Sequence, residues 1–142
     1  MDIKLFLKIL QSELWQTPLS LPAISRSDGD ELFDFAENQA VIGLFSNALV
    51  HNSIHIGDDN AMRAVASIRL VCRKNEEMNV DFCKCIAFLR RRNLSFLTVK
   101  GQTLASLYPN PLHRNPGDVD IFCGLTGFVP IRDAFLCNND GS

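Results

Sequence analysis

The stretch LTVKGQTLASLYPNPLHRNPGDVDIF, residues 97–122, decides the fold that the sequence predicts. The β-forming residues at its start are followed by Lys100-Gly101, which predicts a strand over 95–99 that ends in a turn. The QTLASLY segment then predicts a short helix, because its leucines recur at helical spacing. After a proline-rich loop, DVDIFC predicts a second strand over 118–123. The stretch as a whole therefore predicts a β-α-β unit.

Two aspartates, Asp118 and Asp120, stand one residue apart at the front of the second predicted strand. Because strand side chains alternate between faces, both carboxylates are expected on one face, about 7 Å apart, with Val119 and Ile121 on the other. Two like charges on one face repel each other, and a cation between them compensates; magnesium prefers such hard oxygen ligands. The pair by itself favours the other interpretation, in which the aspartates only cap the turn after Gly117 and face solvent, because a short acidic pair is common by chance.

The turn after the first predicted strand is the second chemically suggestive element. Backbone amides at the start of the helix after Gly101 are suited to bind phosphate, with Lys100 as a nearby positive charge. An acidic pair at the start of a strand, beside an earlier strand that ends in such a turn, suits a site in which the turn receives phosphates and the acidic strand holds metal. The spacing therefore favours a metal-triphosphate site.

The composition indicates one ordinary globular domain. The chain has 142 residues, of which 46% are hydrophobic and 21% charged, with a net charge of −2. It has no basic stripe of the kind that binds a phosphate backbone. The one local basic cluster, Lys84 with 90–92, falls where a helix is expected to end, and we interpret it as favourable charge at the negative helix terminus.

Residue usage also bears on the cellular compartment. The five cysteines are odd in number and lack zinc-knuckle spacing, which indicates reduced thiols. Asp2, Lys4 and Lys8 interrupt the apolar N-terminus, so it lacks the core of a signal peptide. No apolar run approaches the ~20 residues of a membrane span. We expect a cytoplasmic protein without membrane contact, and we interpret His51 and His55 as surface histidines.

The part of the chain before the β-α-β unit is predicted to be mainly helical. A first amphipathic helix stops before Pro18, and a second begins near Glu31, with Asp28 and Asp30 as its capping residues. The segment AVIGLFSNALVH predicts a third helix. One long helix or two nearly continuous ones follow over 60–92, with Asn75 as a polar gap in the apolar stripe.

The 97–122 stretch resembles the signature of an uncharacterised nucleotidyltransferase family of the polymerase-beta-like nucleotidyltransferase superfamily. In that family a strand leads into Lys-Gly, a short helix ends in Leu-Tyr-Pro, and an arginine precedes a small residue and Asp-hydrophobic-Asp-hydrophobic. The chain matches at Lys100, Gly101, Leu107, Tyr108, Pro109, Arg114, Gly117, Asp118 and Asp120. The resemblance covers about a fifth of the chain, and combined order and spacing make it more specific than either half.

The resemblance implies metal-dependent transfer of a nucleoside monophosphate from a nucleoside triphosphate to an unknown acceptor. Asp118 and Asp120 would be the catalytic ligands of Mg²⁺ (or Mn²⁺), and Gly101 with Gln102 would line the triphosphate. Lys100 and Arg114 would either contact phosphate or hold Asp118 and its loop by ion pairing.

The expected fold class is therefore α+β. A helical N-terminal region, residues 1–92, would lead into a partial nucleotidyltransferase core, residues 93–142. The helix predicted at 128–137, FVPIRDAFLC, would be the last element of this core.

The chain departs from the superfamily pattern in two respects. Gln102 replaces the serine that commonly follows the turn glycine, so an amide stands where a hydroxyl would contact phosphate. A third catalytic carboxylate from a later strand is not found, and Asp133 in the predicted last helix is a poor substitute. The sequence is therefore interpreted as the N-terminal part of such an enzyme, truncated at its C-terminus.

These departures leave two hypotheses open. The chain is either a nucleotidyltransferase with little activity alone, or a non-catalytic helical interaction module that retains a remnant nucleotide site. Two strands rarely form a stable sheet by themselves, and a strand edge invites pairing with another chain. We therefore expect a homodimer or a partner chain that completes the sheet.

Overall fold

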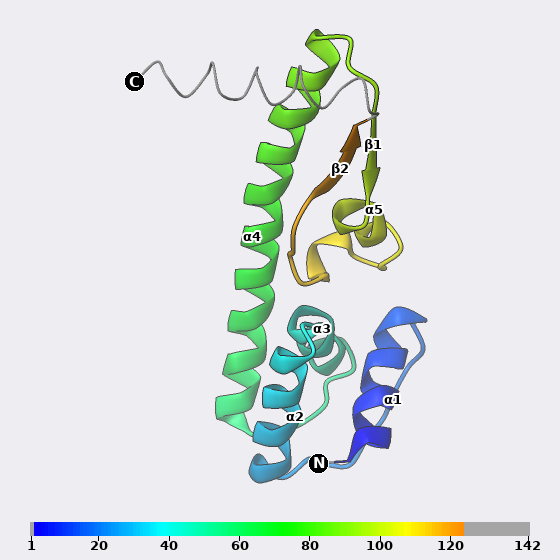
Figure 1. Ribbon diagram of the computed structural model, residues 1–142. Helices are drawn as coiled ribbons and strands as arrows, with labels where there is room; N and C mark the ends of the chain where they lie inside the picture. The colour runs from blue at the N-terminus through cyan, green and yellow to red at the C-terminus, as the bar shows by residue number, and fades with distance from the viewer. Residues whose placement is uncertain (1, 124–142) are drawn as a thin grey trace.

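The computed structural model describes residues 2–123, which form helices and one small sheet (Figure 1). The elements in chain order are α1 Ile3–Leu14, α2 Arg26–Asn38, α3 Ile42–His51, α4 Asp58–Arg91, β1 Phe96–Val99, α5 Gly101–Ala105, the 3-10 helix η1 Pro111–His113 and β2 Asp120–Cys123. The expected combination of a helical region with strands after it, an α+β architecture, is confirmed for these residues. The helix predicted at 128–137, with Asp133, lies outside them.

The first three helices pack around one apolar core at one end of α4 (Figure 1). Phe45 of α3 is fully buried at its centre, with its ring centroid 5.4 Å from that of Phe6 and 5.3 Å from that of Phe33. Each helix contributes an aromatic ring to this cluster, and aromatic pairs add stability beyond the area they bury. The core is therefore built by contacts among the first three helices.

The start of α2 corrects one prediction. The helix begins at Arg26 rather than near Glu31, because Ser25, and not Asp28 or Asp30, is its N-cap. The backbone of Ser25 is extended, and its hydroxyl oxygen accepts a hydrogen bond from the N–H of Asp28. Asp28 instead lies in the first turn, where its charge interacts favourably with the positive end of the helix.

The residues expected to form one or two long helices form a single one. Helix α4 contains 34 residues and runs along both the helical core and the sheet (Figure 1). It begins after Gly57, whose φ of +82° suits a glycine, and its last turn contains Arg90 and Arg91 as expected. Within residues 2–123 no helix has the length and apolar character needed to cross a membrane.

The two predicted strands lie side by side, as expected, and they pair antiparallel. The second strand begins at Asp120 rather than at 118, so Asp118 precedes it. The reason lies in the partner strand: Val99 pairs with Asp120, and after Val99 the chain turns away into α5. No part of β1 therefore remains opposite Asp118.

The loop before β2 is bound to the helical region. The Asn75 side chain on α4 is fully buried, and its Nδ2 lies 2.9 Å from the carbonyl oxygen of Leu112 and 2.7 Å from that of Arg114. Asn115 Oδ1 accepts a hydrogen bond of 3.2 Å from the N–H of Gly43 on α3. A Cβ on Gly43 would stand 2.5 Å from the carbonyl oxygen of His113 in the same loop, so only glycine fits there. The polar gap in the α4 stripe is thus the attachment point of this loop.

Candidate functional site

The structure brings the Lys100-Gly101 turn and the aspartate segment together at one end of the sheet. Val99 and Asp120 are the last pair of the ladder, and Lys100 follows Val99 directly. The Nζ of Lys100 lies 3.7 Å from Oδ2 of Asp120. Both side chains are open to solvent, with 75% and 45% of their surfaces exposed, so this ion pair adds little to stability.

Gly101 packs against the backbone of Asp118. A Cβ at Gly101 would stand 2.9 Å from the carbonyl oxygen of Asp118, closer than real side chains approach, and the φ of Gly101 is +41°. Both facts require glycine at this position. The tight approach holds the turn beside the acidic segment, although the two are separated in sequence by α5 and the η1 loop.

Lys100 itself has a backbone conformation that is rare for a lysine, with φ of 56° and ψ of −146°. Such values lie near a region populated almost only by glycine, and they persist only where the surroundings hold them. Lys100 stands between the end of β1 and the glycine that packs on Asp118. The turn is therefore held from both sides.

Gln102 is oriented toward the long helix rather than toward the turn. Its Nε2 donates a hydrogen bond to Oδ1 of Asn79 on α4, and its buried Oε1 has no hydrogen-bond partner among residues 2–123. The side-chain amide that replaces the expected serine is thus used in packing. Only the backbone N–H of Gln102, in the first turn of α5, remains in a position typical of phosphate contacts.

The Arg114 side chain contacts the loop backbone and not the aspartates. Its Nη1 donates to the carbonyl oxygen of Asn115 at 3.2 Å, and its own carbonyl oxygen accepts from Asn75. In the part of the chain that the structure describes, no ion pair joins Arg114 to Asp118 or Asp120. Of the two cations singled out by sequence, Lys100 is the one near the acidic pair.

A divalent cation would find two hard oxygen donors at this end of the sheet. Asp118 is exposed and Asp120 is half-buried, so a hydrated ion has access to both. Across residues 2–123 no group of three or more histidine, cysteine, aspartate or glutamate side chains is placed to hold a metal ion. Mg²⁺ usually keeps several waters and completes its shell with substrate phosphates, so it requires few ligands from the protein.

A groove of about 470 Å³ lies between α4 and the segment that leads into β2. Met78, Phe82 and Cys85 line it on the helix side, and Val119 and Ile121 line it on the strand side. Val119 and Ile121 therefore share one side of the segment, as the predicted alternation requires. Neither Asp118 nor Asp120 contributes to this groove.

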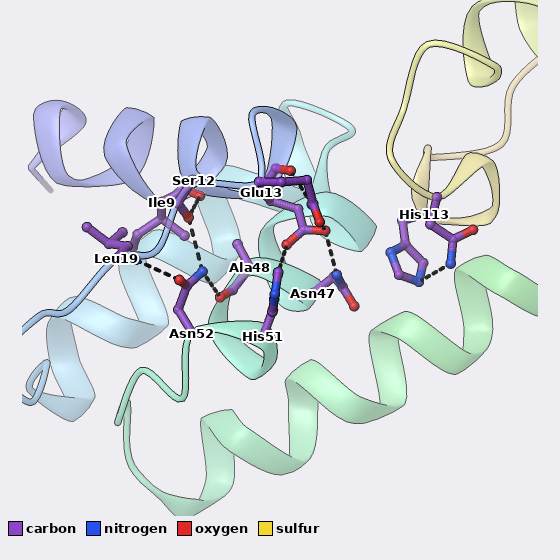
Figure 2. Close-up of polar contacts among 11 residues, drawn as sticks. Ile9, Ser12, Glu13, Leu19, Asn47, Ala48, His51, Asn52 and His113 are labelled. Carbon is purple, nitrogen blue, oxygen red and sulfur yellow. Dashed lines mark hydrogen bonds and ion pairs between the residues drawn. The ribbon is translucent and has the colours of Figure 1, made fainter.

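A second polar cluster, which the sequence did not reveal, joins α1 to α3 (Figure 2). The Glu13 side chain is only 4% exposed, and its Oε1 accepts a hydrogen bond of 2.7 Å from Nδ2 of Asn47. Its Oε2 lies 3.0 Å from Nδ1 of His51. His51, interpreted from sequence as a surface histidine, is half-exposed and holds this buried carboxylate. The available signal was the one-turn spacing of Asn47 and His51 on α3.

His113 of η1 lies near this cluster (Figure 2). Its Nε2 is 3.0 Å from Nδ2 of Asn110, and its buried Nδ1 has no hydrogen-bond partner within residues 2–123. Burial lowers the pKa of His113, while the negative charge of Glu13 acts in the opposite direction. His113 is therefore a neutral packing residue at neutral pH.

Comparison with known proteins identifies no relative. No protein-family model matches the chain, and neither the curated proteins nor the solved structures contain a significant match.

Proposed function

We propose that the chain is a metal-dependent nucleotidyltransferase, or the N-terminal part of one. In this proposal Asp118 and Asp120 hold Mg²⁺ or Mn²⁺, and the Lys100-Gly101 turn receives the phosphates of a nucleoside triphosphate. The observation that supports it best is the contact between Gly101 and the backbone of Asp118, which places the two halves of the sequence signature side by side.

The reaction would be an in-line attack of an acceptor oxygen on the α-phosphate. When bound, the divalent ion supplies charge stabilisation to the entering and leaving oxygens. The two carboxylates would orient this ion at the end of the sheet. The Lys100 ammonium, exposed beside the acidic pair, and the backbone N–H of Gln102 in the first turn of α5 would bind phosphate oxygens.

The proposal predicts low turnover by this chain alone. Among residues 2–123 no third carboxylate stands beside Asp118 and Asp120 to accept the proton of the acceptor hydroxyl. General-base catalysis typically contributes about 10²- to 10⁴-fold, so its loss reduces turnover while leaving nucleotide binding in place. A third acidic strand would come from further residues or from a partner chain.

Calorimetric titration with Mg²⁺ and ATP tests the proposal. The combined Asp118→Ala and Asp120→Ala variant should lose binding, because it removes both hard ligands. The matched control is Asp58→Ala with Asp59→Ala, which removes two neighbouring carboxylates at the start of α4 and should bind like the unmodified protein.

Unchanged nucleotide binding in the double aspartate variant would contradict the proposal. That result would favour a helical interaction module with a remnant nucleotide site. One observation supports this second candidate: Leu97 of β1 and Phe122 of β2 stand opposite each other, and 61% and 62% of their surfaces are exposed. Such an exposed apolar pair is typical of a surface that binds another protein.

A further inference from the structure

The Lys100 ammonium lies beside an oxygen that a divalent cation would use. Its Nζ approaches Oδ2 of Asp120, and of the described residues it is the one cation paired with either aspartate. Asp120 belongs to the last pair of the ladder, so its position relative to the turn is set by the sheet. At this separation the contact is an ion pair without a hydrogen bond, so a divalent cation bound to Asp120 would be repelled by the nearby ammonium.

The turn places the start of the Lys100 side chain close to Asp120. Lys100 follows the strand residue that pairs with Asp120, and Gly101 is wedged against Asp118. The unusual φ of Lys100 fixes the direction in which its Cβ leaves the backbone. Glycine would adopt the same backbone conformation without strain, yet the residue at this position is a lysine with a long cationic side chain.

We propose that Lys100 is a tethered counter-ion that competes with the divalent cation for Asp120. This inference rests on the proposed function, because it assumes that the aspartate pair binds metal. Without nucleotide, the lysine neutralises Asp120 and weakens the binding of free metal. When phosphate oxygens draw the ammonium away, Asp120 is released to the metal, so metal and nucleotide favour each other's binding.

The test is the binding of Mn²⁺ alone, measured by the loss of the free-ion signal in electron paramagnetic resonance at low ionic strength. Lys100→Met should tighten Mn²⁺ binding by about two- to fivefold, a range expected for the loss of one exposed ion pair. Lys100→Arg keeps the charge and should bind like the unmodified protein. Lys84→Met removes an equally exposed lysine that pairs with Asp81 on α4, and it should leave Mn²⁺ binding unchanged.

A second variant separates charge from backbone strain. Lys100→Gly removes the ammonium and also relieves the positive φ, so it should fold at least as well and tighten Mn²⁺ binding to the same extent. The inference is overturned if both Lys100→Met and Lys100→Gly leave Mn²⁺ binding unchanged or weaken it while Asp120→Asn still abolishes it. If Asp120→Asn leaves Mn²⁺ binding intact, the metal site and the proposed function fail together with this inference.

Discussion

Asn75 of α4 lies 2.7 Å from the carbonyl oxygen of Arg114 and joins the long helix to the loop that precedes the acidic segment. The same side-chain nitrogen lies within hydrogen-bond distance of the carbonyl oxygens of Leu112 and Val71. The side chain is fully buried, so water cannot replace these contacts. This amide and the hydrogen bond between Asn115 and Gly43 together attach the loop before the aspartate segment to the helices.

Replacing this amide by an apolar side chain of similar size should destabilise the protein. Asn75→Leu leaves the carbonyl oxygens of Leu112 and Arg114 without a donor, which should cost about 1–3 kcal/mol of unfolding free energy. Urea unfolding followed by circular dichroism measures this loss. The same substitution at the exposed Asn38 is the control, and it should change stability by about 0.5 kcal/mol or less. Equal stability of the two variants would show that Asn75 does not anchor the loop.

The protein should lose stability below neutral pH through His113. Burial lowers the pKa of His113 in the folded state below its ordinary value of 6.5. A depressed folded-state pKa means that the unfolded chain binds the proton more tightly, so the stabilisation is present above pH 6.5 and is lost as pH falls toward the folded-state pKa.

Urea unfolding at pH 7.5 and pH 5.5 measures this dependence. His113→Gln should lose less stability over that interval than the unmodified protein, because a neutral amide replaces the titrating ring. His55→Gln, at an exposed histidine, should retain the full loss. An identical pH dependence of unmodified protein and His113→Gln would assign the effect to other groups.

The chain should self-associate through the exposed face of its sheet. Leu97 and Phe122 form an exposed cross-strand apolar pair, and a two-stranded sheet gains stability when its apolar face is covered. Light scattering at micromolar concentration should detect a dimer. Leu97→Lys combined with Phe122→Lys should shift it to a monomer, whereas Leu70→Lys, at an exposed leucine of α4, should not. A monomeric unmodified protein would refute the dimer.

Local sequence signals predicted the elements of the β-α-β unit better than its exact boundaries. The strands were identified from their β-forming residues and from the glycine and proline around them, which act locally. The start of the second strand was placed too early because a ladder ends where the partner strand turns away, at Lys100. The end of the ladder is set by the partner strand, so the DVDIF segment by itself does not indicate where the second strand begins.

The candidate site shows the same division between local and tertiary information. Gly101 was singled out from sequence, but the residue it packs against, Asp118, is known only from the folded chain. Gln102 was also singled out from sequence, but the hydrogen bond of its side chain to Asn79 is known only from the folded chain. The buried Glu13 cluster forms only where α1 packs against α3. A single glutamate in an amphipathic helix does not by itself indicate such a cluster.

The His113 carbonyl oxygen packs closely against Gly43, and this contact limits where the chain can be divided into fragments. A piece that stops at residue 92 would remove the loop that fills the space beside Gly43, Val71 and Asn75, and would open that part of the interior to water. A minimal expression fragment of the helices should therefore continue through Asn115, whose side chain caps the N–H of Gly43. The helices and the segment that leads into the sheet share this interface, so a fragment that ends there loses packing contacts on both sides.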